Sequence, residues 1–279
     1  MEKDAKNNAK DQEAEISFAF LSSFKKGEDV TIRDDLYDFQ LLLDAAKLTR
    51  SKGIPFRLVD SGTLDFLRLE WLAREGTFIY SSDQSPRKIE ELERIGKSCK
   101  RGRSFLAYFQ NGPLGSESED HSSGFQGMLR LGDEGIYIFL SNRDEKREWK
   151  QLFDLADRCR RGGSWLVYYH HGELVGDLVE LAGNGAWIHV AGSSLINGED
   201  PSLLFEIIKS AVTSDANLVF HAIEEMGFYL VNDILKAGAF LLFQSTLLDY
   251  RSPLKPLEEK ASGKKLDMRA FYLYETFFF

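Results

Sequence analysis

The chain has 279 residues, of which 43% are hydrophobic and 28% are charged, and its formal net charge is −9. The net acidity argues against a general coat for nucleic acid, no apolar run approaches the roughly 20 residues of a membrane span, and two cysteines do not make a secreted disulfide framework. We therefore expect a cytoplasmic protein with no membrane insertion, large enough for one big domain or two medium ones.

The N-terminal stretch 1–14 is polar and lacks the apolar core of a signal peptide, so we expect a disordered tail there. The apolar run 16–21 predicts a first strand. A polar loop follows at 22–29, and the stretch 31–35 then leads into a first long helix at 41–52.

The main feature of the sequence is an internal repeat. The stretch CKRGRSFLAYFQNGPL at 99–114 returns sixty positions later as CRRGGSWLVYYHHGEL at 159–174, with Cys, Gly, Ser, Leu and Tyr in register. Matches at this density indicate duplication of one structural unit. Cys99 and Cys159 occupy equivalent positions near helix ends, and we expect both to be buried packing residues.

Each repeat has the same order of helix, glycine stop, apolar strand, second helix, glycine stop and second strand. In the copy with the clearest pattern these are helix 147–161, strand 165–169, helix 174–181 and strand 186–190. The other elements, in chain order, are strand 55–59, helix 64–74, strand 77–80, strand 136–140, helix 203–212, strand 218–220, helix 226–236 and strand 240–243. About nine strands thus alternate with about eight helices.

Strands that alternate with helices at this spacing form right-handed crossovers and a mainly parallel sheet. Four tandem αβαβ repeats over about 250 residues favour a (β/α)8 TIM-like barrel, although a ninth strand is one too many for it. The alternative is one or two open, doubly wound sheets. We assign the α/β repeat domain to 15–248, with a surface loop or lid at 115–124, and a C-terminal arm to 249–279.

The arm ends in the aromatic sequence MRAFYLYETFFF. It can fold back over an open end of the core. It can also bind a protein partner or a second copy of the chain, since an exposed apolar end usually marks an interaction site. The residues that would make this contact are Phe271, Tyr272, Tyr274, Phe277, Phe278 and Phe279.

No specific catalytic signature is present, whether a nucleotide-binding glycine loop, a zinc-protease helix or a serine-hydrolase elbow. Sites in parallel sheets lie at the carboxyl ends of the strands. The side chains predicted there that can do acid–base work are Asp60, His170, His171, His221, Glu224 and Glu225. Three of them, His170, His171 and His221, are candidate ligands for a divalent metal. Ser82, Asn111, Asn142 and Ser194 are candidate ligand-binding residues, and we expect the serines at these strand ends to cap the helices that follow.

Three functions fit these observations. The first, favoured because few titratable groups stand at strand ends, is non-catalytic binding of a small ligand or protein partner. The second is metal-assisted hydrolysis of phosphate esters, which alone requires a divalent metal cofactor. The third is RNA or protein scaffolding through a basic rim at 47–52, 97–103 and 158–161.

Overall fold

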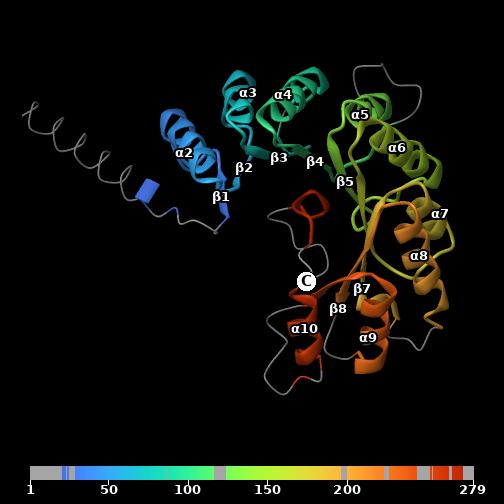
Figure 1. The fold of residues 1–279 in the computed structure, drawn as a ribbon. Coiled ribbons are helices and arrows are strands. Elements are labelled where there is room, and N and C mark those ends of the chain that lie inside the picture. Colours follow the sequence, from blue (N-terminus) through green and yellow to red (C-terminus); the bar gives the residue numbers. More distant parts are fainter. Residues whose placement is uncertain are drawn as a thin grey trace, which may run out of the picture. The chain divides into compact units, whose positions relative to one another are not determined.

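The structure is a computed structural model of the chain. It describes residues 21–22, 24, 29–85, 87–115, 124–195, 200–222, 226–243, 252, 254–263 and 266–272. In these residues nine strands alternate with helices (Figure 1). The chain packs as two compact units, one formed by 1–87 and 94–106 (unit 1) and the other by 88–93 and 107–279 (unit 2).

Unit 1 contains three parallel strands in chain order. Strand β1 pairs with β2, and β2 with β3, so that Ile32, Leu58 and Ile79 form a buried row across the three. Its elements are β1 (Val30–Arg33), α2 (Phe39–Lys52), β2 (Phe56–Val59), α3 (Phe66–Arg74), β3 (Phe78–Ser82) and the greater part of α4 (Ile89–Gly102).

Unit 2 repeats this pattern from β4 to β9, again with parallel pairing in chain order. Its elements are β4 (Leu106–Gln110), α5 (Gly124–Asp133), β5 (Tyr137–Ser141), α6 (Trp149–Gly162), β6 (Leu166–His170), α7 (Asp177–Gly183), β7 (Trp187–Ala191), η1 (Gly192–Leu195), α8 (Ser202–Thr213), β8 (Leu218–Ala222), α9 (Phe228–Ala237), β9 (Phe240–Phe243), α10 (Lys255–Ala261) and η2 (Met268–Ala270).

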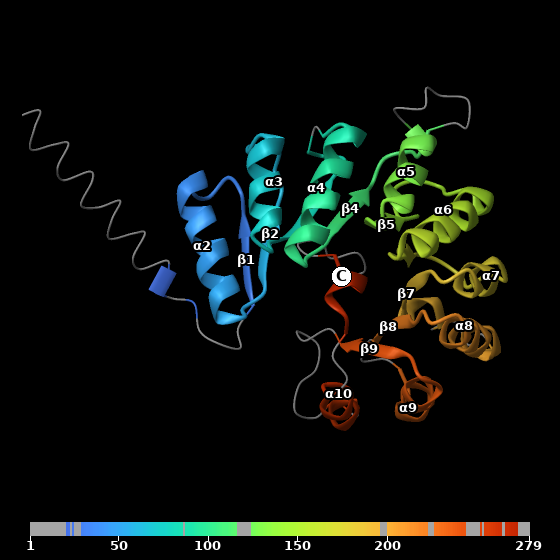
Figure 2. The same ribbon diagram turned by 45° about the horizontal axis from the view of Figure 1, so that its top comes forward.

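The order of the strands decides how the sheet is wound. A doubly wound sheet reverses its strand order at a switch point, and within each unit no such reversal occurs. Right-handed crossovers between consecutive neighbours place all the connecting helices on one face, as Figure 2 shows for α5 to α9. The predicted α/β repeat fold with barrel-type winding is confirmed, and the doubly wound alternative is wrong within each unit.

The first strand is not where the sequence predicts it. Residues 16–20 lie outside the described part of the chain, and Leu21 and Ser22 are helical. The strand β1 lies instead after the predicted polar loop, in the stretch expected to lead into the first helix. Only Ile32 of this four-residue strand is buried, and Asp29 and Arg33 flank its apolar residues. Such a strand leaves no apolar run in the sequence.

Other expectations concern the core and its boundaries. Cys99 and Cys159 are fully buried, as predicted. The tail 1–14, most of the loop 115–124 and the boundary at 248/249 lie outside the described residues. Among the helices that the structure describes, none has the length and apolar character needed to cross a membrane.

Glycines at equivalent repeat positions allow close backbone contacts at the ends of α4 and α6. A Cβ atom on Gly102 would lie 2.0 Å from the carbonyl oxygen of Ala73, and one on Gly162 would lie 2.0 Å from that of Gly132. In each unit the repeat therefore conserves not only a helix stop but also a point where two helix ends meet.

The substitution Gly162→Ala tests this contact. Because the new methyl group would meet backbone, we expect the free energy of unfolding to fall by about 1–3 kcal/mol. The control Gly176→Ala has nothing within 4 Å of its Cβ and an ordinary φ of −58°, so it should change stability by less than about 0.5 kcal/mol. Equal urea midpoints for the two variants would contradict the close-contact account.

Candidate functional site

The strands of unit 2 carry a second buried face, opposite the helices, which we call the inner face. Side chains alternate along a strand, so Tyr168 contacts Trp149 of α6, at 6.2 Å between ring centroids, while its neighbour Tyr169 points to the inner face. Register places Phe109 beside Phe139, Tyr169 beside His189, and Ala191 beside His221. The residues of the inner face that matter below are Phe109, Tyr137, Phe139, Trp165, Tyr169, His189 and His221.

The C-terminal segment Asp267–Tyr272 covers this face, and Figure 2 draws its η2 turn in red on the side of the strands away from the helices. The Tyr272 ring lies 5.4 Å from that of Phe109 and 5.3 Å from that of Phe139. The backbone N–H of Tyr272 donates to the hydroxyl of Tyr169 at 3.2 Å. The arm therefore folds back over its own core as far as Tyr272.

The rest of the predicted contact surface is not described, since Tyr274, Phe277, Phe278 and Phe279 lie outside the described residues. Tyr272 is buried, at 4% exposure, and Phe271 is half-buried. A role of this aromatic end in binding a protein partner or a second copy stays a prediction.

Two buried imidazoles form a hydrogen-bonded chain with the C-terminal segment. His189 Nε2 lies 2.7 Å from the carbonyl oxygen of Ala270, and His189 Nδ1 lies 2.9 Å from His221 Nε2. A carbonyl oxygen can only accept, so His189 carries its proton on Nε2 and accepts at Nδ1 from the N–H of His221. In neutral His221 the lone pair then lies on Nδ1.

Burial keeps these rings uncharged. Desolvation, followed by the neighbouring His221, holds the pKa of His189 well below its usual value. Burial also lowers the pKa of His221 to about 3, with His171 as the second cause. Both imidazoles are therefore neutral at pH 7, which agrees with the donors and acceptors assigned to the hydrogen bonds between Ala270, His189 and His221.

The predicted histidines divide between the two faces. His171 follows β6 and acts electrostatically on His221, and its own pKa is lowered to about 4 by burial and then by the charge of Arg143. His170 lies instead beside Tyr168, with its Nε2 2.7 Å from the carbonyl oxygen of Glu173. Side chains alternate along a strand, which explains why these two neighbours lie on different faces.

The predicted metal site is not assembled by the residues that the structure describes. Within the described ranges no three His, Cys, Asp or Glu side chains gather in a way that could hold a metal ion. Glu224 and Glu225 lie outside those ranges.

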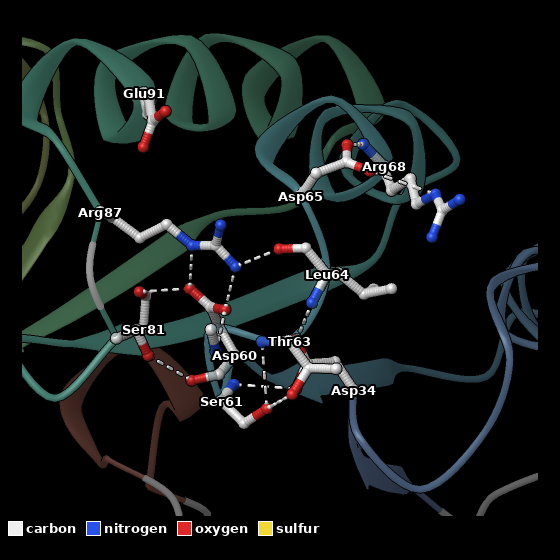
Figure 3. A network of polar contacts seen from close by, with 12 residues as sticks. Asp34, Asp60, Ser61, Thr63, Leu64, Asp65, Arg68, Ser81, Arg87 and Glu91 are labelled. Carbon is white, nitrogen blue, oxygen red and sulfur yellow. Dashed lines mark hydrogen bonds and ion pairs between the residues drawn. The ribbon is translucent and has the colours of Figure 1, made fainter.

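Asp60 follows β2 in unit 1 and is the centre of a polar network (Figure 3). Arg87 donates from Nε to Oδ2 at 3.0 Å and from Nη2 to Oδ1 at 2.7 Å. The hydroxyl of Ser81 and the backbone N–H of Gly62 also donate to this carboxylate, at 2.7 and 2.9 Å. Four hydrogen bonds from protein groups account for the capacity of the carboxylate, so Asp60 stabilises its loop and is not placed to act as a base.

Arg147 is the counterpart of Arg87 sixty positions on. It donates to the carbonyl oxygens of Asn111 and Gly112, both at 2.7 Å, and to that of Ser141 at 2.8 Å. Each arginine therefore fixes the loop after the first strand of the preceding repeat. No role was predicted from the sequence for either arginine. Both lie two residues before a helix and at equivalent positions of the repeat.

The four predicted ligand-binding residues contact the protein's own loops. Asn142 pairs through its amide with both backbone groups of His171, at 2.7 and 2.9 Å, and Ser194 donates to the carbonyl oxygen of Gly172 at 2.7 Å. Ser82 accepts from the N–H of Gln84, and Asn111 is held by Arg147. Helix capping is therefore wrong for Ser82 and Ser194, whose hydroxyls brace loops instead, and a ligand role stays a prediction.

Removing Arg87 should destabilise unit 1 strongly. The side chains of Arg87 and Asp60 are 6% and 0% exposed, so Arg87→Ala would leave a buried carboxylate without its cation and lower the free energy of unfolding by about 3–5 kcal/mol. The control Arg33→Ala breaks the exposed pair with Asp35 and should cost at most about 1 kcal/mol. Similar losses in urea denaturation would show that the Asp60 network is dispensable.

Both thiols should be inert in the native protein. Burial raises the pKa of Cys99 and of Cys159 to about 12, so at pH 8 neither forms the reactive thiolate. We expect a chromogenic disulfide reagent to report no free thiol until denaturant is added and two afterwards. Reaction within minutes in native buffer would contradict this burial.

No family model matches the chain, and no curated protein matches it. Among solved structures, deoxyribose phosphate aldolase from Aeropyrum pernix is 12% identical, covers 83% of this chain and 89% of its own, and has a TM-score of 0.31. Phospho-2-dehydro-3-deoxyheptonate aldolase from Thermotoga maritima is 12% identical over 75% and 67%, with a TM-score of 0.32. An HpcH/HpaI aldolase/citrate lyase family protein from Burkholderia cenocepacia is 10% identical over 80% and 98%, with a TM-score of 0.33.

These neighbours are enzymes, which disagrees with the prediction of a non-catalytic binding or scaffolding protein, and that prediction is not carried further. The basic rim of the scaffolding hypothesis is also partly neutralised, since Arg50 pairs with Glu75 and Arg158 with Asp133. Likeness at this level carries no argument for a particular reaction, substrate or site.

Proposed function

We propose that unit 2 is catalytic and that His221 transfers a proton to or from a small carbonyl compound bearing an anionic group. The observation that supports this is the chain from the Ala270 carbonyl through His189 to His221. A hydrogen bond to one ring nitrogen determines which nitrogen holds the proton, and catalytic histidines are commonly oriented in this way. Here His221 donates from Nε2 to His189, so its Nδ1, which carries the lone pair and can accept a proton, is directed away from His189.

The location of His221 fits this role. His221 lies next to the last residue of β8, and His171 directly follows β6, so both stand at the carboxyl ends of parallel strands, where such folds carry their sites. The aromatic side chains of the inner face and the C-terminal segment bury both rings, with His189 at 0% and His221 at 7% exposure, and burial strengthens polar interactions.

Charges of both signs lie near these rings. Arg143 lowers the pKa of His171, and Asp144, which pairs with Arg143 at 3.0 Å, raises it. An anionic group bound beside these rings would raise their low pKa values towards the range in which imidazole is an effective acid–base catalyst. Without such a group the imidazoles stay neutral and weakly basic.

Packing alone does not require an imidazole at position 189. The strand register places Tyr80 of β3, Phe139 of β5 and Leu242 of β9 at the equivalent point of their repeats, so an aromatic or aliphatic side chain fills this position in all three sister copies. Buried polar groups are unfavourable unless they are hydrogen-bonded, and two linked imidazoles are a costly way to fill a core. This contrast supports a chemical role for the pair.

The test is deuterium exchange at the methyl group of pyruvate in D2O, followed by ¹H NMR. We expect the wild-type protein to accelerate exchange above buffer and His221→Gln to reduce the acceleration by about 100-fold or more, the usual contribution of a general acid–base group. The matched control is His170→Gln, which points to the other face and has Gln110 as its repeat counterpart, so it should retain activity.

Two results would contradict the proposal. One is a wild-type protein that does not accelerate exchange of pyruvate above buffer. The other is a folded His221→Gln variant, verified by its melting temperature, that is as active as His170→Gln.

A further inference from the structure

We infer that Arg269 is a positioning residue for the His189–His221 pair, so that the C-terminal segment belongs to the site. This inference rests on the proposed function for its catalytic meaning. Its structural content is that one arginine on the segment determines where the Ala270 carbonyl lies, and thereby which nitrogen of His189 carries the proton.

Arg269 anchors the segment to Tyr137 of β5 and to Trp165, the residue just before β6. Its guanidinium carbon lies 4.8 Å from the ring centroid of Trp165 and 5.9 Å from that of Tyr137, and its Nη1 lies 3.4 Å from the hydroxyl of Tyr137. Asp267 accepts from Nε at 2.9 Å and from Nη2 at 2.5 Å, so the two-pronged geometry keeps the guanidinium plane fixed over the rings.

The next residue carries the carbonyl that His189 contacts. Asp267 also accepts from the backbone N–H of Arg269, at 2.9 Å, and its own carbonyl accepts from the N–H of Ala270, at 2.9 Å. These bonds make the 3-10 turn η2 rigid between its anchor and the Ala270 carbonyl. Two residues further on, Tyr272 N–H donates to Tyr169, which fixes the other side.

The exposure of the Arg269–Asp267 ion pair distinguishes a positioning role from a contribution to global stability. The side chains of Arg269 and Asp267 are 43% and 28% exposed, and ion pairs at such exposure contribute little to the free energy of unfolding. The Ala270 carbonyl and His189 are, by contrast, fully buried. Loss of Arg269 should therefore alter the hydrogen bond to His189 much more than it alters global stability.

The experiment uses the full chain with ¹⁵N-labelled histidine and the variant Arg269→Ala. In the wild type we expect a slowly exchanging Nε2–H signal from His189. In the variant this proton should exchange with water at least ten-fold faster, and pyruvate exchange should fall at least ten-fold. Guanidinium chloride at low millimolar concentration, which can occupy the vacated place over Trp165, should restore both readouts in part.

Two variants serve as controls. Arg158→Ala removes an arginine of α6 from its ion pair of 3.0 Å with Asp133, the last residue of α5, and should change neither readout. Arg269→Lys keeps the positive charge but loses the paired hydrogen bonds of the guanidinium to Asp267, so we expect an intermediate exchange rate for the His189 proton. If Arg269→Ala does not fold, Arg269→Lys is the variant that tests the inference.

An unchanged His189 signal in folded Arg269→Ala, or in Arg269→Lys if the alanine variant is unfolded, overturns the inference, even if the wild type is active. If Arg269→Ala loses the His189 Nε2–H signal and guanidinium restores it, the positioning role is supported. If the wild type at the same time does not exchange the protons of pyruvate, only the proposed function is overturned. The two claims thus fail separately.

Discussion

A parallel sheet has to be covered on both faces, because its strands are apolar on both. In unit 2, β5 to β8 are buried at every residue. The crossover helices cover one face and leave the inner face to other parts of the chain. The C-terminal segment meets this requirement by placing Tyr272 on Phe109 and Phe139.

This covering creates the chemical environment of the histidines. A segment that packs only through side chains would leave its backbone groups without partners, at a considerable energetic cost. Here the Ala270 carbonyl and the Tyr272 N–H are bonded by His189 and Tyr169. The same contact that completes the core therefore selects the tautomer of a buried imidazole. Core packing and acid–base chemistry depend here on one short segment.

The repeat made much of the fold predictable. Helical spacing, glycine stops and apolar runs predicted the strands from β2 onwards. His189 was overlooked because it stands inside an apolar run, although Phe139 and Tyr80 at the equivalent positions were a signal. Its hydrogen-bond partner, the carbonyl of Ala270, is 81 residues away, so no local sequence pattern could predict that hydrogen bond. The arginines Arg87 and Arg147 were missed for the same reason, since their partners are loops 23–37 residues earlier.

The central claim is that the buried histidine pair is neutral and that its tautomers are fixed by the C-terminal segment. The most direct measurement is the ¹⁵N spectrum of histidine-labelled wild-type protein at pH 7. We predict that His189 and His221 are both protonated at Nε2 alone, with slow solvent exchange for the His189 proton. A charged ring, a proton on Nδ1 of His189, or rapid exchange of its Nε2–H would contradict the account.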